Sequence, residues 1–219
     1  MPMLRLYDTI TSGNGYKVRW ILMRLGLPFE RVELDIDRGE TRTPAFLAMN
    51  PNGRVPLLRI APGDWLAESN AILCYLAEGT PYMPADRRGR AAVLQWLFFE
   101  QYSHEPNIAT PRYWIKHDVL TDERRAQLPG KMQWGYAALD VMERHLARQR
   151  YFVGERLGIA DIALFAYTHV AEEGGFVLAK YPAVRDWIGR IADLPGHFPI
   201  TAAVGTPRAW SAIAAGDAT

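Results

Sequence analysis

The alternation of strand-like and helix-like periods in the first eighty residues most constrains the fold. Residues 3–7 (MLRLY) predict a short strand, and residues 18–25 place apolar side chains at the i, i+3, i+4 and i+7 positions of an amphipathic helix. Residues 29–34 then alternate as a second strand does. A strand, a helix and a strand within so short a span predict a parallel pair joined by a right-handed crossover.

The rest of this region predicts a second helix, a hairpin and a third helix. Thr43-Pro44 predicts a helix start with proline at the first position. Residues 56–60 and 64–66 are two short apolar runs separated by a Pro-Gly turn, so we expect an antiparallel hairpin at the sheet edge. Residues 68–78 (ESNAILCYLAE) predict a helix that ends at a glycine.

The composition changes at residues 79–88, and no later stretch predicts a strand. We therefore expect an α/β domain over residues 1–80, a linker over 81–88 and an all-α domain over 89–219. Pro106 and Pro111 predict a kink or break in the first long helical stretch. The other helices are expected at 122–150, disturbed near Pro129, at 160–170, buried on all sides, and at 184–194, with the chain from 202 onward loosely attached.

Charge and cysteine content exclude several classes of function. The formal net charge is +1, which gives no electrostatic reason to expect a nucleic-acid or membrane-surface partner. Cys74 is the single cysteine, so an internal disulfide and a cysteine-based metal cluster are excluded, and we expect no metal site. No signal peptide or run of ~20 apolar residues is found, so a cytoplasmic location is expected.

Three motifs together make the chain resemble a cytosolic glutathione transferase over nearly its whole length. Residues 50–57 (NPNGRVPL) are similar to the family segment N-P-x-G-x-V-P-x-L, and residues 68–72 (ESNAI) are similar to E-S-x-A-I. Residues 158–161 (GIAD) are similar to the start of the buried helix of the family's C-terminal domain, with glycine in place of Ser or Thr. The resemblance implies a thioredoxin-like N-terminal domain, an all-α C-terminal domain and glutathione as co-substrate.

The resemblance also implies which residues bind glutathione. In the family the bond before the equivalent of Pro56 is cis, and the backbone of the preceding residue, here Val55, pairs with the cysteinyl unit. Ser69 stands at a predicted helix N-terminus, where free N–H groups favour a carboxylate. Glu68 offers a countercharge for the γ-glutamyl ammonium, and Arg54 could receive the glycyl carboxylate. Without the resemblance, Glu68-Ser69 would be interpreted as a plain helix cap.

The thiol-activating group is expected in the loop before the first helix. A free thiol has a pKa of ~8.5 and only the thiolate attacks, so the site needs a hydrogen-bond donor to the sulfur. Counted back from Lys17, Ser12 stands where zeta- and tau-like members have their catalytic serine, and residues 14–17 (NGYK) resemble the loop of nu-class bacterial members. We predict Ser12 first and Asn14 second, with Thr11 as a neighbour. Tyr7, at the end of the first strand, is the alternative donor, and turn formation with helix capping is the alternative explanation of the loop.

An electrophile pocket is implied between the domains of such a protein. The candidate lining residues share an aromatic ring and lie in the first helical stretch of the second domain: Phe99, Tyr102, His104, Tyr113 and Trp114. Core or dimer contacts are the alternative role for aromatic residues at helical spacing.

Three functions remain open at this point. The first is transfer of glutathione to a hydrophobic electrophile, a detoxification reaction. The second is glutathione-dependent reduction of a disulfide or peroxide, and the third is a non-catalytic binding protein with the same fold. The resemblance also implies a homodimer.

Overall fold

The computed structural model describes residues 3–210 and residue 213. It divides into two compact units. The first comprises the residues up to Glu78 together with those from Phe198 onward, and the second is Gly79–His197.

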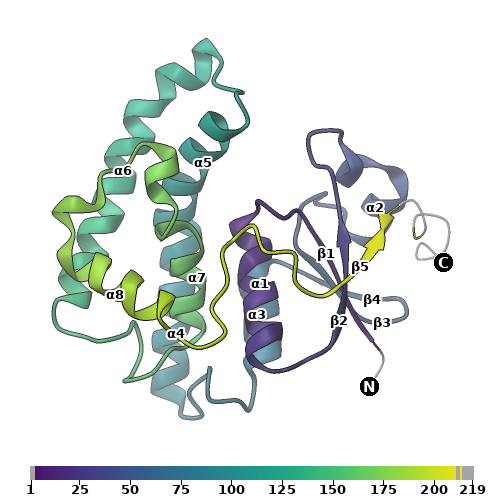
Figure 1. The fold of residues 1–219 in the computed structure, drawn as a ribbon, viewed down its shortest axis with the longest axis horizontal. Coiled ribbons are helices and arrows are strands. Elements are labelled where there is room, and N and C mark those ends of the chain that lie inside the picture. The colour runs from purple at the N-terminus through teal and green to yellow at the C-terminus, as the bar shows by residue number, and fades with distance from the viewer. Residues whose placement is uncertain (1–2, 211–212, 214–219) are drawn as a thin grey trace. The chain divides into compact units, whose positions relative to one another are not determined.

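The first unit is built on a five-stranded sheet with the order β4-β3-β1-β2-β5 (Figure 1). Its first two strands, β1 (Leu4–Asp8) and β2 (Phe29–Glu33), are parallel and joined through helix α1 (Gly13–Arg24), as the sequence predicts. Strands β3 (Leu57–Ala61) and β4 (Asp64–Ala67) form the predicted antiparallel hairpin, and β3 is antiparallel to β1.

Alternating side chains of β1 face opposite sides of this sheet. Tyr7 lies in a buried cluster with Phe46, which belongs to helix α2 (Pro44–Met49), and with Trp210. The next residue, Asp8, therefore points to the other side, where α1 and helix α3 (Ser69–Ala77) lie side by side (Figure 1).

A 3-10 turn, Glu40–Arg42, precedes α2, whose N-cap is Thr43, as predicted.

The C-terminal segment is where the sequence prediction is wrong. Instead of a loosely attached end of the helical domain, residues 198–210 belong to the first unit, and Thr206–Ala209 form strand β5, parallel to β2. All four residues of β5 are exposed, so their side chains carry no alternating pattern from which a strand could be predicted. Backbone pairing and the ion pair between Arg208 and Glu30, 2.9 Å from Nε to Oε1, attach the strand.

The second unit is helical, as expected, apart from turns. Helix α4 (Arg87–Phe99) passes through a π-helical turn, Glu100–His104, into α5 (Glu105–Lys116), so the break falls just before Pro106, and Pro111 lies inside α5. Helix α6 (Asp122–Leu146) continues through Pro129 without the predicted disturbance. The remaining elements are α7 (Ile159–Thr168), 3-10 turns at Ala171–Gly174 and Leu178–Lys180, and α8 (Pro182–Ala192).

Helix α7 is buried at all ten positions, as the sequence predicts. Its first turn is held by Asp161, whose carboxylate accepts hydrogen bonds from the Gly158 and Phe152 amides and from Trp187 Nε1, at 3.1, 3.0 and 3.0 Å. Burial raises the pKa of Asp161 to about 6, against the lowering effect of these donors. The glycine at the cap position is therefore compensated by the aspartate three residues later.

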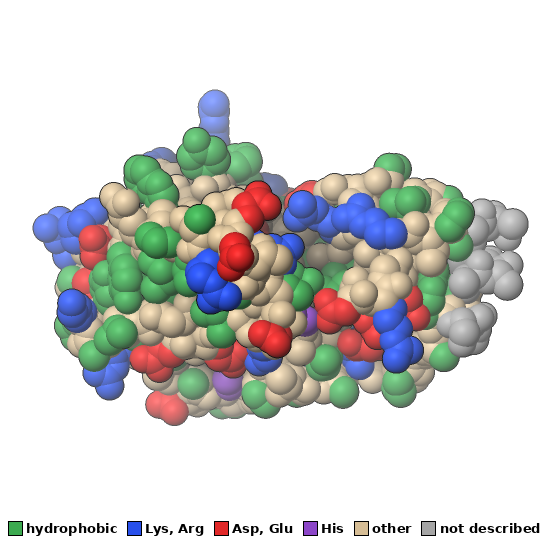
Figure 2. All heavy atoms as spheres, turned by 90° about the horizontal axis from the view of Figure 1, so that it is seen from above, with side chains coloured by type: hydrophobic (Ala, Val, Ile, Leu, Met, Phe, Trp, Pro, Cys, Tyr) green, Lys and Arg blue, Asp and Glu red, His purple; other side chains and the backbone are tan. Residues whose placement is uncertain are grey.

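The surface carries both signs of charge. On the face drawn in Figure 2, basic and acidic side chains both occur and neither covers it, which agrees with the formal net charge of +1. Among the described residues, no helix has the length and apolar character needed to cross a membrane.

Candidate functional site

The two predicted thiol-contacting residues lie where the loop after β1 enters α1: Ser12 ends the loop and Asn14 is in the first turn of the helix. Ser12 is the N-cap of α1, and its Oγ accepts a hydrogen bond from the Gly15 amide at 3.2 Å. This bond uses a lone pair of the hydroxyl oxygen, so the Ser12 O–H can still donate. Ser12, Thr11 and Asn14 are all half-buried, so a ligand can reach them.

Asn14 belongs to a network that joins the N-termini of two helices. Its Oδ1 accepts hydrogen bonds from Lys17 Nζ at 2.7 Å and from Ser69 Oγ at 3.2 Å. Lys17 Nζ also donates to Ser69 Oγ at 3.3 Å. Lys17 belongs to α1 and Ser69 is the first residue of α3, so the predicted sulfur-contacting loop and the predicted carboxylate site are neighbours.

This network has a clear preference for an anion. The N-terminus of a helix carries unpaired amides and the positive end of the helix dipole, and here two such ends meet at one corner of the first unit. Lys17 adds a basic side chain that is completely buried beneath Asn14 and Ser69. The hydrogen bonds from Lys17 and Ser69 end at Asn14 Oδ1, so neither of them uses the Nδ2 donor of the same amide.

Glu68 precedes Ser69 in an unusual backbone conformation. Its φ is 67° and its ψ is 113°, in a region that residues with a side chain rarely occupy. The Glu68 side chain is exposed, and within the described part of the chain it makes no cap hydrogen bond to α3. Backbone outliers of this kind are concentrated at functional sites, because the surrounding structure must hold them in place.

The segment before β3 has the predicted cis bond between Val55 and Pro56. Asn50 Nδ2 donates to the Arg54 carbonyl at 2.8 Å and so holds the turn before it. Val55 lies outside the sheet, whose β3 pairing starts at Leu57, and within residues 3–210 its N–H and C=O make no turn or loop hydrogen bond. The Arg54 side chain is exposed.

Tyr7 lies away from these residues. Its side chain is completely buried in the cluster with Phe46 and Trp210, on the face of the sheet opposite to Asp8 and α1. A ligand at the surface of the loop cannot reach this hydroxyl without opening the core. The structure therefore separates the alternative donor from Ser12 and Asn14.

The structure does not bring the five predicted pocket residues together. Phe99 and Tyr102 line an apolar hollow of about 390 Å³ in the second unit together with Trp134, which the sequence analysis missed. His104 is instead completely buried, with Nε2 2.8 Å from Thr168 Oγ1, so it is a core residue. The other two also lie elsewhere: Trp114 is buried under the Arg124 guanidinium, and Tyr113 packs on His117.

Comparison with known proteins shows the family of the chain. The family model described as "Glutathione S-transferase, N-terminal domain" matches residues 2–78, and the model of the C-terminal domain of the same family matches residues 102–195. The chain belongs to the glutathione S-transferase family. Its sequence is 33% identical to glutathione S-transferase 3 of Zea mays, over 94% of this chain and 97% of that protein. It is also 31% identical to the disulfide-bond oxidoreductase YfcG of Escherichia coli, over 95% of this chain and 100% of that protein.

Solved glutathione transferase structures are similar over most of the chain. One from Pseudomonas fluorescens Pf-5 has a TM-score of 0.89 and 50% identity, and the match covers 91% of this chain and 100% of that one. A second member from the same organism, with two glutathione molecules bound, has a TM-score of 0.77 and 28% identity over 88% of this chain and 89% of that one. Homologous structures thus bind glutathione, as expected of a family whose members use it as co-substrate.

Proposed function

We propose that this glutathione transferase family member joins glutathione to a hydrophobic electrophile. The observation that carries the proposal is the network of Asn14, Lys17 and Ser69, which places the start of α1 beside the start of α3. A tripeptide lying along Val55 would set its γ-glutamyl carboxylate at the Ser69 end and its sulfur at the Ser12 end. Glu68 would then face the ammonium group, and Arg54 the glycyl carboxylate.

Ser12 and Asn14 activate the thiol in this proposal. The Ser12 hydroxyl donates a hydrogen bond to the sulfur and Asn14 Nδ2 supplies a second, which favours the thiolate over the thiol. The thiol proton leaves to solvent. The sulfur lone pair then forms a bond to the electrophilic carbon, and either the leaving group departs with its electron pair or, at an activated double bond, the adjacent carbon takes a proton.

A Ser12→Ala variant tests this role. A hydrogen bond to a charged group contributes about 1.5–3 kcal/mol, so kcat with an aryl halide is expected to fall about 10- to 100-fold, and the kinetic pKa of the thiol to rise. Ser12→Thr keeps the hydroxyl and is expected to retain most of the activity. Because Ser12→Ala also removes a helix cap, Thr121→Ala is the matched control: it removes the N-cap of α6, which accepts from the Arg124 amide at 3.3 Å. Equal turnover of Ser12→Ala and wild type would move the assignment to Asn14.

The hollow lined by Phe99, Tyr102 and Trp134 is our proposed binding surface for the electrophile. Its volume of about 390 Å³ lies in the range of small-molecule sites, ~300–1,000 Å³, and two polar side chains, Ser103 and Asn107, also line it. Trp134→Ala is expected to raise KM for a hydrophobic electrophile and to leave KM for glutathione unchanged. Equal increases in both constants would remove this assignment.

Glutathione-dependent disulfide reduction is the second candidate function. Its support is the similarity to the disulfide-bond oxidoreductase YfcG and to a family member with two glutathione molecules bound. In such a reaction one glutathione thiolate attacks a disulfide sulfur, breaks the S–S bond and releases the first thiol, which leaves a mixed disulfide with glutathione. A second glutathione thiolate then attacks the glutathione sulfur of that mixed disulfide, forms oxidised glutathione and releases the second thiol. Turnover of a mixed disulfide that greatly exceeds turnover of an aryl halide would favour this function. A protein that binds immobilised glutathione and turns over neither substrate would be a binding protein.

A homodimer in the cytoplasm is our proposed working form. Leu94 and Phe98, four residues apart on α4, expose 42% and 70% of their surface, an arrangement typical of a contact between copies. Light scattering of the wild type is expected to give twice the chain mass, and Phe98→Glu is expected to give the mass of one chain. Ile115→Glu on α5 is the matched control and is expected to stay dimeric, and a monomeric wild type would contradict the dimer.

Fractionation of cells expressing the protein tests the cytoplasmic location.

A further inference from the structure

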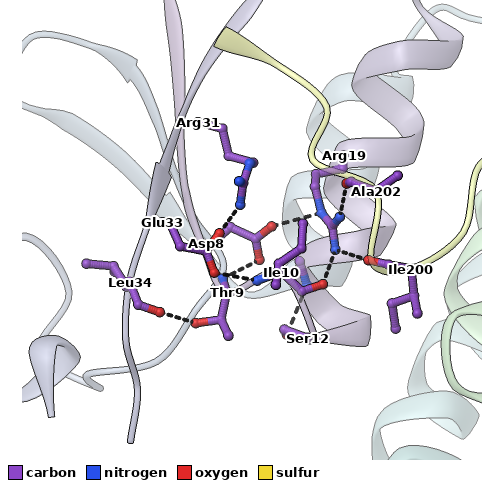
Figure 3. Close-up of polar contacts among 11 residues, drawn as sticks. Asp8, Thr9, Ile10, Ser12, Arg19, Arg31, Glu33, Leu34, Ile200 and Ala202 are labelled. Atoms are coloured by element: carbon purple, nitrogen blue, oxygen red, sulfur yellow. Dashed lines mark hydrogen bonds and ion pairs between the residues drawn. The ribbon is translucent and has the colours of Figure 1, made fainter. Parts of the chain in front are cut away.

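A buried ion pair lies beside the loop that ends at Ser12 and the first turn of α1 that carries Asn14. Asp8 is the last residue of β1 and Arg19 lies in the second turn of α1, and both side chains are completely buried. Arg19 Nε is 2.9 Å from Asp8 Oδ2 (Figure 3). The pair thus connects the two elements between which residues 9–12 run.

Arg19 also holds two other segments through its remaining guanidinium donors. Nη2 donates to the carbonyl of Ile10, inside the loop, and to that of Ile200, both at 2.9 Å, and Nη1 donates to the Ala202 carbonyl at 2.8 Å (Figure 3). One planar group therefore forms an ion pair with β1 and hydrogen bonds with the loop and the C-terminal segment. A lysine, with a single ammonium, could not reproduce this fork.

Asp8 contacts both the loop and the first turn of α1. Its Oδ1 accepts a hydrogen bond from the Thr9 amide at 2.7 Å, at the start of the loop. In the first turn of α1, Gly15 lies so close to the carboxylate that a Cβ there would be 1.5 Å from Oδ1. Two outer bonds complete the restraint: Thr9 Oγ1 donates to the Leu34 carbonyl at 2.6 Å, and the Ile10 amide to Glu33 Oε1 at 2.8 Å.

Stability alone is a weak reason for such a pair. Removing two charges from water is costly, and well-packed apolar residues often replace a buried pair without loss. Burial raises the pKa of Asp8 to about 6, although Arg19 and the Thr9 amide oppose the rise. The two residues instead fix an arrangement: the Thr9 amide and the Ile10, Ile200 and Ala202 carbonyls can all be hydrogen-bonded together only when the loop and the C-terminal segment lie as they do here.

We propose that Asp8 and Arg19 are positioning residues for thiol activation, which set the loop so that Ser12 and Asn14 address the sulfur and which make that geometry depend on the segment around residues 200–202. This inference rests on the proposed function. Neither residue touches glutathione, because neither has any exposed surface. Both act through the loop backbone.

Asp8→Asn and Arg19→Lys test the proposal through the pH profile of kcat/KM for an aryl halide at saturating glutathione, which reports the pKa of the bound thiol. Asn keeps an acceptor for the Thr9 amide and loses the charge, and Lys keeps the charge and loses the fork. Each variant is expected to lower kcat about tenfold and to raise the kinetic pKa of the thiol, while KM for glutathione changes less than twofold, because Val55 and Ser69 are untouched.

Asp161→Asn is the matched control for these variants. Asp161 is an equally buried carboxylate that also accepts bonds from amides, but it lies in the second unit. Its replacement is expected to lower the melting temperature and to leave the kinetic pKa unchanged. If Asp8→Asn does the same, the pair is structural only and the proposal is overturned. If instead Ser12→Ala has no effect on the thiol, the proposed function fails first, so the two failures are distinguishable.

Tyr16→Phe provides a milder variant in case the charged variants do not fold. The Tyr16 hydroxyl donates to the Phe198 carbonyl at 2.8 Å, and the Phe ring can keep the packing on Trp20 and Phe198. Hydrogen exchange is expected to increase in the amides of residues 198–202 and also of residues 9–12, although the hydroxyl that is removed donates to the Phe198 carbonyl. An increase confined to residues 198–202 would show that the segment and the loop are independent, which overturns the coupling.

Discussion

Replacing Gly15 by alanine perturbs the corner on which the thiol loop depends. Gly15 lies in the first turn of α1, where alanine is favoured over glycine by up to about 1 kcal/mol. The Asp8 carboxylate opposes this gain by steric overlap, because its Oδ1, Cγ and Oδ2 lie only 1.5, 2.4 and 2.9 Å from where the Cβ of residue 15 would be. Arg19 and the Thr9 amide hold that carboxylate from the other sides, so it cannot simply rotate away.

The magnitude follows from these opposing effects. Overpacking a filled site costs about 1–3 kcal/mol, and weakening the buried ion pair adds to that cost. We expect Gly15→Ala to lower the free energy of unfolding by about 2 kcal/mol, which for a chain of this size corresponds to about 4–8 °C in the melting temperature. Glutathione conjugation is expected to fall as well, because Ser12 caps the same turn.

Urea unfolding followed by circular dichroism measures this effect. Gly189→Ala is the matched control, because Gly189 lies in α8 and nothing outside its own helix comes within 4 Å of where a Cβ would lie. This variant is expected to be as stable as wild type or up to about 1 kcal/mol more stable. Gly15→Ala made in the Asp8→Ala variant completes a double-mutant cycle. In that variant, Gly15→Ala should lower the free energy of unfolding much less than it does in the wild type. If Gly15→Ala behaves like Gly189→Ala, the description of this corner is wrong.

Three further predictions concern other residues. Glu68→Gly should stabilise the fold by about 1 kcal/mol, because glycine accepts a φ of 67°, and should weaken glutathione binding in calorimetry. Glu68→Gln should weaken glutathione binding without stabilising the fold. Tighter binding of glutathione by either variant would be inconsistent with the countercharge role. Burial lowers the pKa of His169 to about 4, so between pH 6.5 and 4 the unfolded chain binds more protons than the folded chain. The free energy of unfolding therefore decreases as the pH is lowered through this range, by roughly 3 kcal/mol at most. His169→Asn should flatten that slope, and an unchanged slope would argue against a neutral buried ring. Arg54→Ala should raise KM for glutathione at low salt more than at high salt, since the Arg54 side chain is exposed; a salt-independent effect would exclude charge attraction.

The order of elements could be predicted from the sequence because local signals agreed with the fold. Thr43-Pro44 starts α2, and the run at 160–170, apolar on nearly every face, gives the buried helix α7. Strand β5 could not be predicted, because its four residues are exposed and adopt the strand conformation by pairing with β2 rather than by burying alternate side chains. The cis bond at Val55-Pro56 was expected from the family resemblance, because sequence alone gives a cis X–Pro bond a frequency of ~5%.

The site was predicted less completely than the fold. The family resemblance indicated Ser12, Asn14 and Ser69, which the structure places at the starts of α1 and α3, and their contacts with glutathione stay a prediction. The burial of Lys17 was missed, because a lysine in an amphipathic helix ordinarily faces solvent. The partnership of Asp8 with Arg19 was missed too, since their sequence separation fits no local pairing rule and the contact exists only once β1 and α1 pack together. His104 was misassigned because aromatic spacing does not reveal which rings are enclosed.

The crystal structure of the complex with glutathione tests the central claim most directly. The account predicts the sulfur within about 3.5 Å of Ser12 Oγ or Asn14 Nδ2, the cysteinyl backbone paired with Val55, and the γ-glutamyl carboxylate at the amide of Ser69. A sulfur whose nearest donor is the Tyr7 hydroxyl, or a tripeptide bound away from Ser69, would contradict it.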